Sequence, residues 1–465
     1  MEHEGAVLLR TAFLTLLLAL LPLPARAQSP TPDAGTAAPP AAPGASTTPA
    51  GTRLLHLDEA IQTAVANAPQ LVQAQANAAA ADAQTITARS PLLPQGTGIA
   101  SFLRQHSTVG ASTGTGSGTV AIVPGARPST YNSFRIGVVG TQTLWDPVDF
   151  ATWESQQHTA DALRATAATT LKNVVLSVRT TYFAARATRD LVKVAQDTLT
   201  NQLAHLSQVE GFVRVGTQPE IALALARLNV ANARVALITA QNNYRIARAQ
   251  LNQAMGVATG TDYQVADDEL PPVDVEDRPL PGLFDIALGS RPELASLEYA
   301  RQAQGKVLDS ARWQWSPSLG FSGGYSKVGT SVDALYDTWN FGLTLTWNFL
   351  QGGFTTGQIK TAEQNLRSAT AALGIEQLQV RFDVEQAQAT LLANKEALVA
   401  SNDALENAKE QLRLAEGRYQ TGVGTIIELS DAQLQQTQAA AQVVQAQYNV
   451  STARAALLAA LGRGE

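Results

Sequence analysis

The stretch Trp339-Asn-Phe-Gly-Leu-Thr-Leu-Thr-Trp-Asn-Phe349 decides the fold, because its side chains alternate strictly between two kinds. Large apolar residues occupy every second position, and small or polar residues occupy the positions between them. Successive side chains of a strand point to opposite faces, so the pattern predicts one apolar and one polar face. The segment has the length of a tilted strand that crosses a bilayer, and aromatic residues lie at both of its ends. These features favour a membrane-spanning strand over a strand of a soluble β-sandwich.

The same alternation predicts two strands in each half of the chain. Leu319, Phe321 and Tyr325 alternate with small residues, and in the first half Phe134 and Ile136 do so less cleanly. Four strands leave two open edges, and unpaired backbone groups are not tolerated in lipid, so we expect several chains to assemble into one barrel. Two chains would give a barrel filled by side chains, and three would leave room for a lumen. The small polar residues of the other face suit a water-filled lumen.

A very long helix is predicted after each strand pair. Residues 148–213 and 354–419 keep helical periodicity without a proline, and at 1.5 Å per residue each would extend about 100 Å. A shorter helix precedes each pair, over residues 57–88 and 283–311, and a helix of about 35 to 40 residues closes each half. Such lengths indicate coiled-coil packing, in which abundant alanine allows close approach.

The chain contains an internal repeat with an offset of 206 residues. At this offset residues 248–256 match residues 454–462, and Gly216 matches Gly422. Upstream, Asn67-Ala-Pro69 resembles Ser290-Arg-Pro292, and the first half carries extra residues in a loop rich in Gly, Thr and Ser over residues 107–130. The repeat predicts two similar halves. The predicted segments are a signal peptide (1–27), a flexible leader rich in Pro, Ala and Thr (28–53), a first repeat (54–256), a linker (257–282) and a second repeat (283–462).

The amino terminus has the pattern of a secretory signal peptide. A 13-residue apolar run from Thr11 to Leu23 precedes the small-residue motif Ala25-Arg-Ala27, and we place the cleavage site after Ala27. The run is shorter than the ~18 apolar residues that span a bilayer, and prolines interrupt its end. Since no other apolar run of that length follows, no transmembrane helix is predicted.

Composition and motifs argue against several function classes. The net charge of −6 lacks the basic field that a phosphate backbone needs, so no nucleic-acid partner is expected. The absence of cysteine excludes disulfides, thiolate catalysis and cysteine-ligated metals. Phosphate-binding loops and nucleophile elbows are also absent. We therefore expect neither an enzyme nor a cofactor or metal site, because the five histidines fit no metal-ligand spacing either: His3, His56, His106, His158 and His205.

The element order and three short strings resemble the TolC-like outer-membrane efflux protein family, the outer-membrane channels of tripartite efflux or type I secretion systems. The resemblance implies an α+β membrane protein with four β-strands per chain. Three chains would form a homotrimer with a twelve-stranded outer-membrane β-barrel, continued by a long α-helical barrel in the periplasm. The strings are Leu57-Asp-Glu-Ala-Ile-Gln-Thr-Ala-Val-Ala-Asn-Ala-Pro69, Ala88-Arg-Ser-Pro-Leu-Leu-Pro94 and Arg418-Tyr-Gln-Thr-Gly422.

The resemblance also implies a function and partners. The trimer would be a passive export duct for small molecules such as drugs, held in the outer-membrane lipid of a Gram-negative cell. It would work with a periplasmic adaptor (membrane-fusion) protein and an inner-membrane pump. Type I protein secretion and metal efflux are alternatives within the family. In a different class, a non-transport structural or adhesin coiled-coil protein also remains open.

Two glycine turns form the first candidate site. Val215-Gly216 and Gly422-Val423-Gly424 separate the long helix of each half from the helix that follows. Gly permits the positive φ with which a helix ends and the chain reverses. The resemblance implies that both turns lie at the periplasmic tip and dock the adaptor.

Two carboxylates form the second candidate site. Glu428 and Asp431 are three residues apart, so they share one helix face just after the second turn. The resemblance implies that they line the gate at the periplasmic entrance, where they would attract cations and make the duct cation-selective. Glu428 is equally explained by a capping box with Thr425. In the first half Ala222 holds the place of Glu428, and Glu220 is expected to cap its helix through Thr217-Gln-Pro-Glu.

Overall fold

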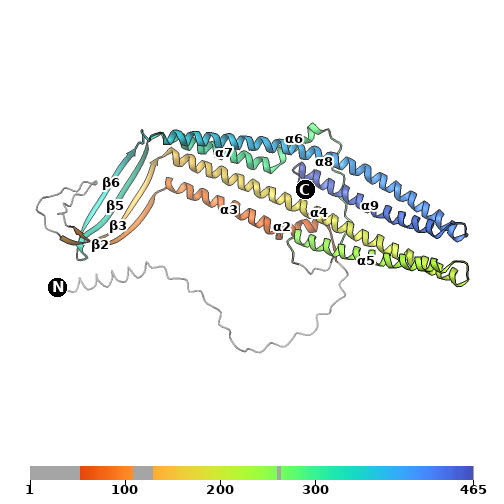
Figure 1. The fold of residues 1–465 in the computed structure, drawn as a ribbon. Helices are drawn as coiled ribbons and strands as arrows, with labels where there is room; N and C mark the ends of the chain where they lie inside the picture. The colour runs from red at the N-terminus through yellow and green to blue at the C-terminus, as the bar shows by residue number, and fades with distance from the viewer. Residues whose placement is uncertain (1–52, 108–128, 259–262, 464–465) are drawn as a thin grey trace, which may run out of the picture. The chain divides into compact units, whose positions relative to one another are not determined.

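The computed structural model describes residues 53–107, 129–258 and 263–463, which are coloured in Figure 1. The predicted signal peptide, the predicted leader up to residue 52 and most of the loop at residues 107–130 lie outside the described residues. The described part combines one four-stranded sheet with a set of long helices, and the strands lead directly into these helices (Figure 1).

The four-stranded sheet has the two strands per half that the alternation predicts. Its strands are β2 (Gln95–Ser107), β3 (Ser129–Trp145), β5 (Ser318–Ser331) and β6 (Ala334–Thr346), all longer than the ten residues or so expected. They pair antiparallel in the order β2-β3-β5-β6, so the pairing of β3 with β5 joins the two halves. The outer edges of β2 and β6 have no partner strand among the described residues.

The long helices begin and end within one residue of their predicted positions. They are α4 (Pro147–Arg214) and α8 (Phe354–Gln420). Asp146 starts α4, because its carboxylate accepts the Val148 N–H at 2.9 Å and Pro147 occupies the first helical position. The closing helices α5 (Glu220–Ala254) and α9 (Ile426–Ala460) each span 35 residues and run back along the long helices (Figure 1).

The first helix of each half is broken, which corrects the continuous helices expected over 57–88 and 283–311. The first half has α2 (Leu57–Asn67) and α3 (Pro69–Arg89), followed by the short 3₁₀ helix η1 (Ser90–Leu92). The second half has α6 (Leu280–Ser290) and α7 (Pro292–Trp313). Each break falls on the residue before a proline, where Ala68 and Arg291 take extended ψ values of 115° and 119°. Proline disfavours the helical conformation of its predecessor, and the sequence pattern does not say whether a helix resumes after it.

The linker between the halves contributes a strand. Residues Tyr263–Val265 form β4, which pairs in parallel with β1 (Arg53–Leu55), so Arg53 belongs to a strand rather than to the leader. A buried cluster joins β1, β4, α2, α4 and α5 around Tyr182 and Phe183. A second cluster joins α6, α8 and α9 around Leu283 and Leu457. The main core therefore lies along the middle of the helices, next to the linker.

The neighbours of the helices change along their length. In the part next to the sheet, α4 contacts α3 and α7, and α7 contacts α8. In the part that ends at the two turns, α4 contacts α5 and α9, and α9 contacts α8. Among the described residues, α5 is the one helix long and apolar enough to span a membrane. Its Ala226, Val230 and Ala233 are buried, while Leu228 and Val235 are exposed.

Candidate functional site

Both predicted turns end their helices with a glycine in the left-handed region. Gly216 has φ +79° and donates its N–H to Val213 O at 3.0 Å, while Thr217 donates its N–H to Phe212 O at 3.0 Å. This is the Schellman pattern, which satisfies carbonyls that would otherwise lack a partner at the helix end. The turn leaves Val215 exposed.

The second turn follows the same pattern with one additional constraint. Gly422 has φ +78° and donates its N–H to Tyr419 O at 3.1 Å, and Val423 donates to Arg418 O at 3.0 Å. A Cβ at Gly424 would lie 3.0 Å from the backbone of Arg418, so this position needs glycine because of a close approach. Val423 is exposed like Val215, and each turn therefore presents one valine to its surroundings.

Ile221 and Ile427 extend this likeness. They stand 206 residues apart, in the first turn of α5 and of α9, and their exposed fractions are 77% and 65%. The α4–α5 hairpin and the α8–α9 hairpin therefore each end in an exposed apolar surface, called the apolar cap, formed by matching residues of the two halves.

The two predicted carboxylates differ in their surroundings. Thr425 caps α9, because its hydroxyl accepts the Glu428 N–H at 3.1 Å, as the capping-box alternative expects. The Glu428 carboxylate does not complete that box; it forms an ion pair with Arg418 Nε at 3.1 Å. Asp431 is exposed on the same helix. The sequence string around Arg418 contained this partner, but spacing alone does not show that α8 brings it beside α9.

The predicted cap of α5 is wrong. The helix begins at Glu220 with Pro219 in the capping position, and no side chain accepts a hydrogen bond there. The Thr217 hydroxyl instead donates to Phe212 O at 3.0 Å, on the preceding helix. The proline at position 219 supplies the extended conformation that a cap needs, so a Thr-x-x-Glu pattern spanning it does not form a box.

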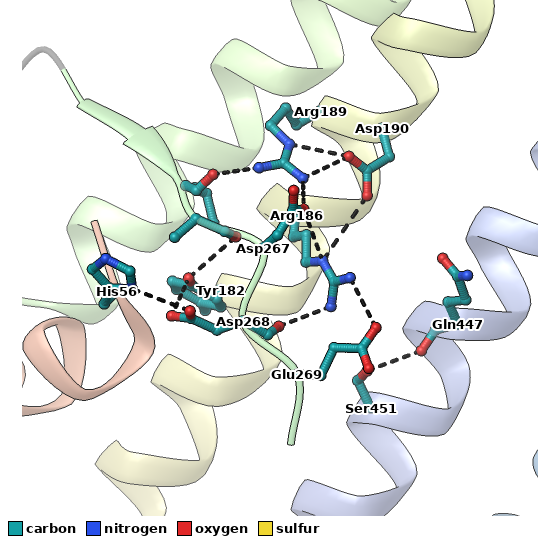
Figure 2. A network of polar contacts seen from close by, with 12 residues as sticks. His56, Tyr182, Arg186, Arg189, Asp190, Asp267, Asp268, Glu269, Gln447 and Ser451 are labelled. Carbon is teal, nitrogen blue, oxygen red and sulfur yellow. Dashed lines mark hydrogen bonds and ion pairs between the residues drawn. The ribbon is translucent and has the colours of Figure 1, made fainter. Parts of the chain in front are cut away.

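A polar network that sequence reasoning missed holds the linker against the first half, as Figure 2 shows. The Tyr182 hydroxyl of α4 donates to the Asp268 carboxylate at 2.9 Å, and the Leu57 N–H donates to the same carboxylate at 2.7 Å. Burial works to raise the pKa of Asp268, but hydrogen bonds from Leu57, His56 and Tyr182 outweigh it and hold the pKa below its ordinary value. The Asp268 carboxylate thus accepts from the first N–H of α2 and from the Tyr182 hydroxyl of α4, so it joins these two helices.

Two arginines of α4 complete this network. Arg186 donates to Asp268 O at 2.8 Å and to the Glu269 carboxylate at 3.2 Å. Arg189 donates a hydrogen bond to the Asp190 carboxylate at 2.7 Å and also pairs with Asp267 (Figure 2). Successive acidic residues of the linker therefore bind arginines on one face of the long helix α4.

The linker also binds the second half through a buried carboxylate. Glu276 is 2% exposed and accepts from Arg454 Nε of α9 at 2.9 Å and from Val273 N–H at 2.9 Å. It also pairs with Lys395 of α8. Burial works to raise the pKa of Glu276, but Lys395, the Val273 N–H and Arg454 outweigh it and lower the pKa. The same linker therefore ties both halves together by charge.

The described residues contain no group of three or more His, Cys, Asp or Glu side chains placed to hold a metal ion. The polar clusters around Asp268 and Glu276 tie the helices to the linker. The candidate functional features are therefore the two turns that end the α4–α5 and α8–α9 hairpins, the exposed carboxylate of Asp431, and the polar face of the sheet.

This chain belongs to the outer membrane efflux protein family, whose sequence profile matches residues 60–257 and 283–463. It is thus an outer-membrane protein of a channel family, as the TolC-like resemblance implied. It is 25% identical to the outer membrane protein TolC of Escherichia coli, over 88% of this chain and 82% of that protein. It is 24% identical to the toluene efflux pump outer membrane protein TtgI of Pseudomonas putida, over 62% of each chain.

A solved structure shares the fold. The Campylobacter jejuni CmeC outer membrane channel superposes with a TM-score of 0.78 at 18% identity, covering 94% of both chains. The alignment with TtgI spans less than two thirds of that relative.

Proposed function

We propose that three copies of this chain form a passive export duct, with a twelve-stranded barrel in the outer membrane continued by a helical barrel. The observation that carries the proposal is the pair of uncompleted edges: β2 lies at one side of the sheet and β6 at the other. An open edge leaves backbone groups unpaired in lipid, so β6 of one copy must pair with β2 of the next. This head-to-tail contact closes into a ring when the rotation fits.

The helices support the same closure. On α5, exposed apolar residues follow a seven-residue spacing at Ile221, Leu228 and Val235, on the face opposite the one packed on α4. On α8, Ile375, Phe382 and further exposed apolar residues follow a similar spacing. Heptad stripes of this kind are buried by a neighbouring helix in coiled coils. We infer that α5 of one copy packs on α8 of the next, on the same two sides that carry the free strands.

The partners proposed are an adaptor in the periplasm and a pump in the inner membrane. The exposed apolar caps at the two turns, each with an isoleucine of matching position, give the adaptor a repeated docking surface. Small molecules such as drugs are the proposed cargo, since the relative TtgI is a toluene efflux pump outer membrane protein. In this proposal the pump supplies the energy for export.

The assembly is tested by Val235→Glu, which puts a charge in the α5 stripe. We expect purified wild-type protein to be a trimer in detergent and to conduct ions in a planar bilayer, and Val235→Glu to lower the trimer fraction. Ala236→Glu is the matched control, because Ala236 is exposed beside the stripe and not in it. A wild-type monomer with intact strands would contradict the proposal.

Docking at the turns is tested separately. Gly216→Arg and Gly422→Arg should abolish drug resistance in cells, because a bulky side chain would obstruct docking at the turn. The trimer and its conductance should persist, because nothing lies within 4 Å of a Cβ added at either glycine. Unchanged resistance in both variants would refute adaptor docking there.

A further inference from the structure

The polar face of the sheet is uncharged on its second-half strands. The register places Gly324 opposite Asn340 and Ser326 opposite Thr338, so these residues share the face that Trp339 and Phe341 do not occupy. On the first-half strands the same face carries Thr97, Ser101, Ser133 and Thr141 together with the apolar residues Ile99, Leu103 and Val139.

Arg135 lies on this polar face. It stands opposite Ser101 on β2 and opposite Val328 on β5. Among the described residues of the four strands, it is the one Arg, Lys, Asp or Glu on that face. Its neighbours in sequence, Phe134 and Ile136, lie on the apolar face, where the Phe134 ring lies 4.7 Å from the Phe102 ring. The other charged residues of the four strands, Arg104, Lys327 and Asp337, lie on the apolar face, opposite to Arg135.

Charged residues lie on both faces. On the apolar face Lys327 and Asp337 neutralise one another, with Nζ and Oδ1 3.2 Å apart, while Arg104 is exposed and has no ion pair with a described residue. Arg135 is exposed and forms no ion pair with any described residue. The register places Arg135 on the face without the aromatic residues of β6, which is the face that would hold water in a barrel.

We propose that Arg135 determines the ionic preference of the barrel part of the duct, where one arginine from each chain would form a ring of positive charge on the lumen wall. This inference rests on the proposed trimeric duct. The ring raises the local concentration of anions and lowers that of cations in the lumen. It favours passage of anionic molecules through the barrel, in opposition to the carboxylates at the other end of the helices.

The test measures the reversal potential of purified trimers in a planar bilayer across a KCl gradient. Arg135→Gln should raise the cation-over-anion permeability ratio about twofold, and Arg135→Glu should raise it further. The change should be larger at 0.1 M than at 1 M salt, because the screening length falls from about 10 Å to about 3 Å. Lys327→Gln with Asp337→Asn is the matched control, since it removes charge at a neighbouring register position on the other face.

The outcomes separate the two proposals. Wild-type protein that does not conduct would refute the duct itself. A conducting wild type whose permeability ratio is the same in Arg135→Gln would overturn the role of Arg135 alone. A variant that keeps the ratio but loses trimer stability would show that Arg135 holds neighbouring copies together instead. A shift in the control variant with none in Arg135→Gln would show that the faces are assigned the wrong way round.

Discussion

Gly256 packs so closely on Asn67 that a Cβ at position 256 would stand 2.6 Å from the Asn67 carbonyl oxygen. The second half repeats this contact, because a Cβ at Gly462 would stand 2.8 Å from Ser290 O. Both glycines have φ +69°. The end of the closing helix in each half therefore rests on the proline-broken joint of the first helix, and only a residue without a side chain fits there.

Alanine at either position should destabilise the protein. In Gly256→Ala the new methyl group meets backbone that cannot move aside and the residue keeps an unfavourable positive φ, so we expect a loss of about 3 kcal/mol. Gly216→Ala is the control, since Gly216 has a similar φ but nothing within 4 Å of the added Cβ, and it should cost about 1–2 kcal/mol. Thermal unfolding of both variants measures the difference; equal losses would show that the close contact is unimportant.

Glu276→Gln should loosen the linker from the second half. Removing one partner of a buried ion pair costs about 3–5 kcal/mol, and Glu276 is buried between Arg454 and Lys395. The folded pKa lies below the ordinary 4.5, so this stabilisation is present above pH 4.5 and is lost as the pH falls through the folded pKa. The melting temperatures of variant and wild type should differ at pH 7 and converge in strong acid.

Glu269→Gln is the control for this prediction. Glu269 lies in the same linker, but its side chain is 70% exposed in its pair with Arg186, so its loss should cost about 1 kcal/mol or less. If both variants lower the melting temperature equally, the burial of Glu276 does not strengthen its ion pairs.

His205 should make the stability of the contact between α4 and α8 sensitive to mild acid. The imidazole is buried beside the Tyr419 ring, with ring centroids 5.5 Å apart, and burial lowers its pKa from 6.5. Below pH 6.5 the unfolded chain therefore binds a proton that the folded chain does not, and stability falls as pH is lowered. His205→Phe should melt with less pH dependence between pH 7 and 5, whereas the exposed His106→Gln should keep the wild-type slope. An unchanged slope in His205→Phe would rule this out.

Asp431 should dominate the cation preference of the entrance. Arg418 offsets the charge of Glu428, while Asp431 forms no ion pair with a described residue. We expect Asp431→Asn to lower the cation-over-anion permeability ratio more than Glu428→Gln, and Arg418→Gln to raise it. Reversal potentials of the three variants decide this. If the double variant Glu428→Gln with Asp431→Asn keeps its cation preference but loses thermal stability, the two residues cap the helix and form no gate.

The sequence predicted elements that depend on nearby residues and missed those that depend on distant ones. The bounds of α4 and α8 follow from an uninterrupted helical pattern that ends at a turn with a glycine. The pairing of β1 with β4 involves three residues on each side, separated by about two hundred residues of chain, and no local pattern marks it. Pro69 marks the break of the first helix, but whether the chain stops or bends there depends on what packs against it, here Gly256.

The candidate site shows the same division. The positive φ of Gly216 and Gly422 could be predicted, because a helix that ends and reverses needs it. The ion pair of Arg418 with Glu428 could not, since it depends on the angle at which two helices leave a turn. The adaptor docking and the gate stay predictions.

The two halves of this chain are alike in form and unlike in charge. Three chains would set six similar sectors around one axis, yet Arg135 occurs in the first-half sectors and Asp431 in the second-half sectors. If Arg135 and Asp431 both line the duct, its wall would be positive near one end and negative near the other, and it would have a fixed electrical polarity along its axis. A tube with that asymmetry passes current more easily in one direction, and rectification in a symmetric salt solution would reveal which end of an inserted trimer faces each electrode.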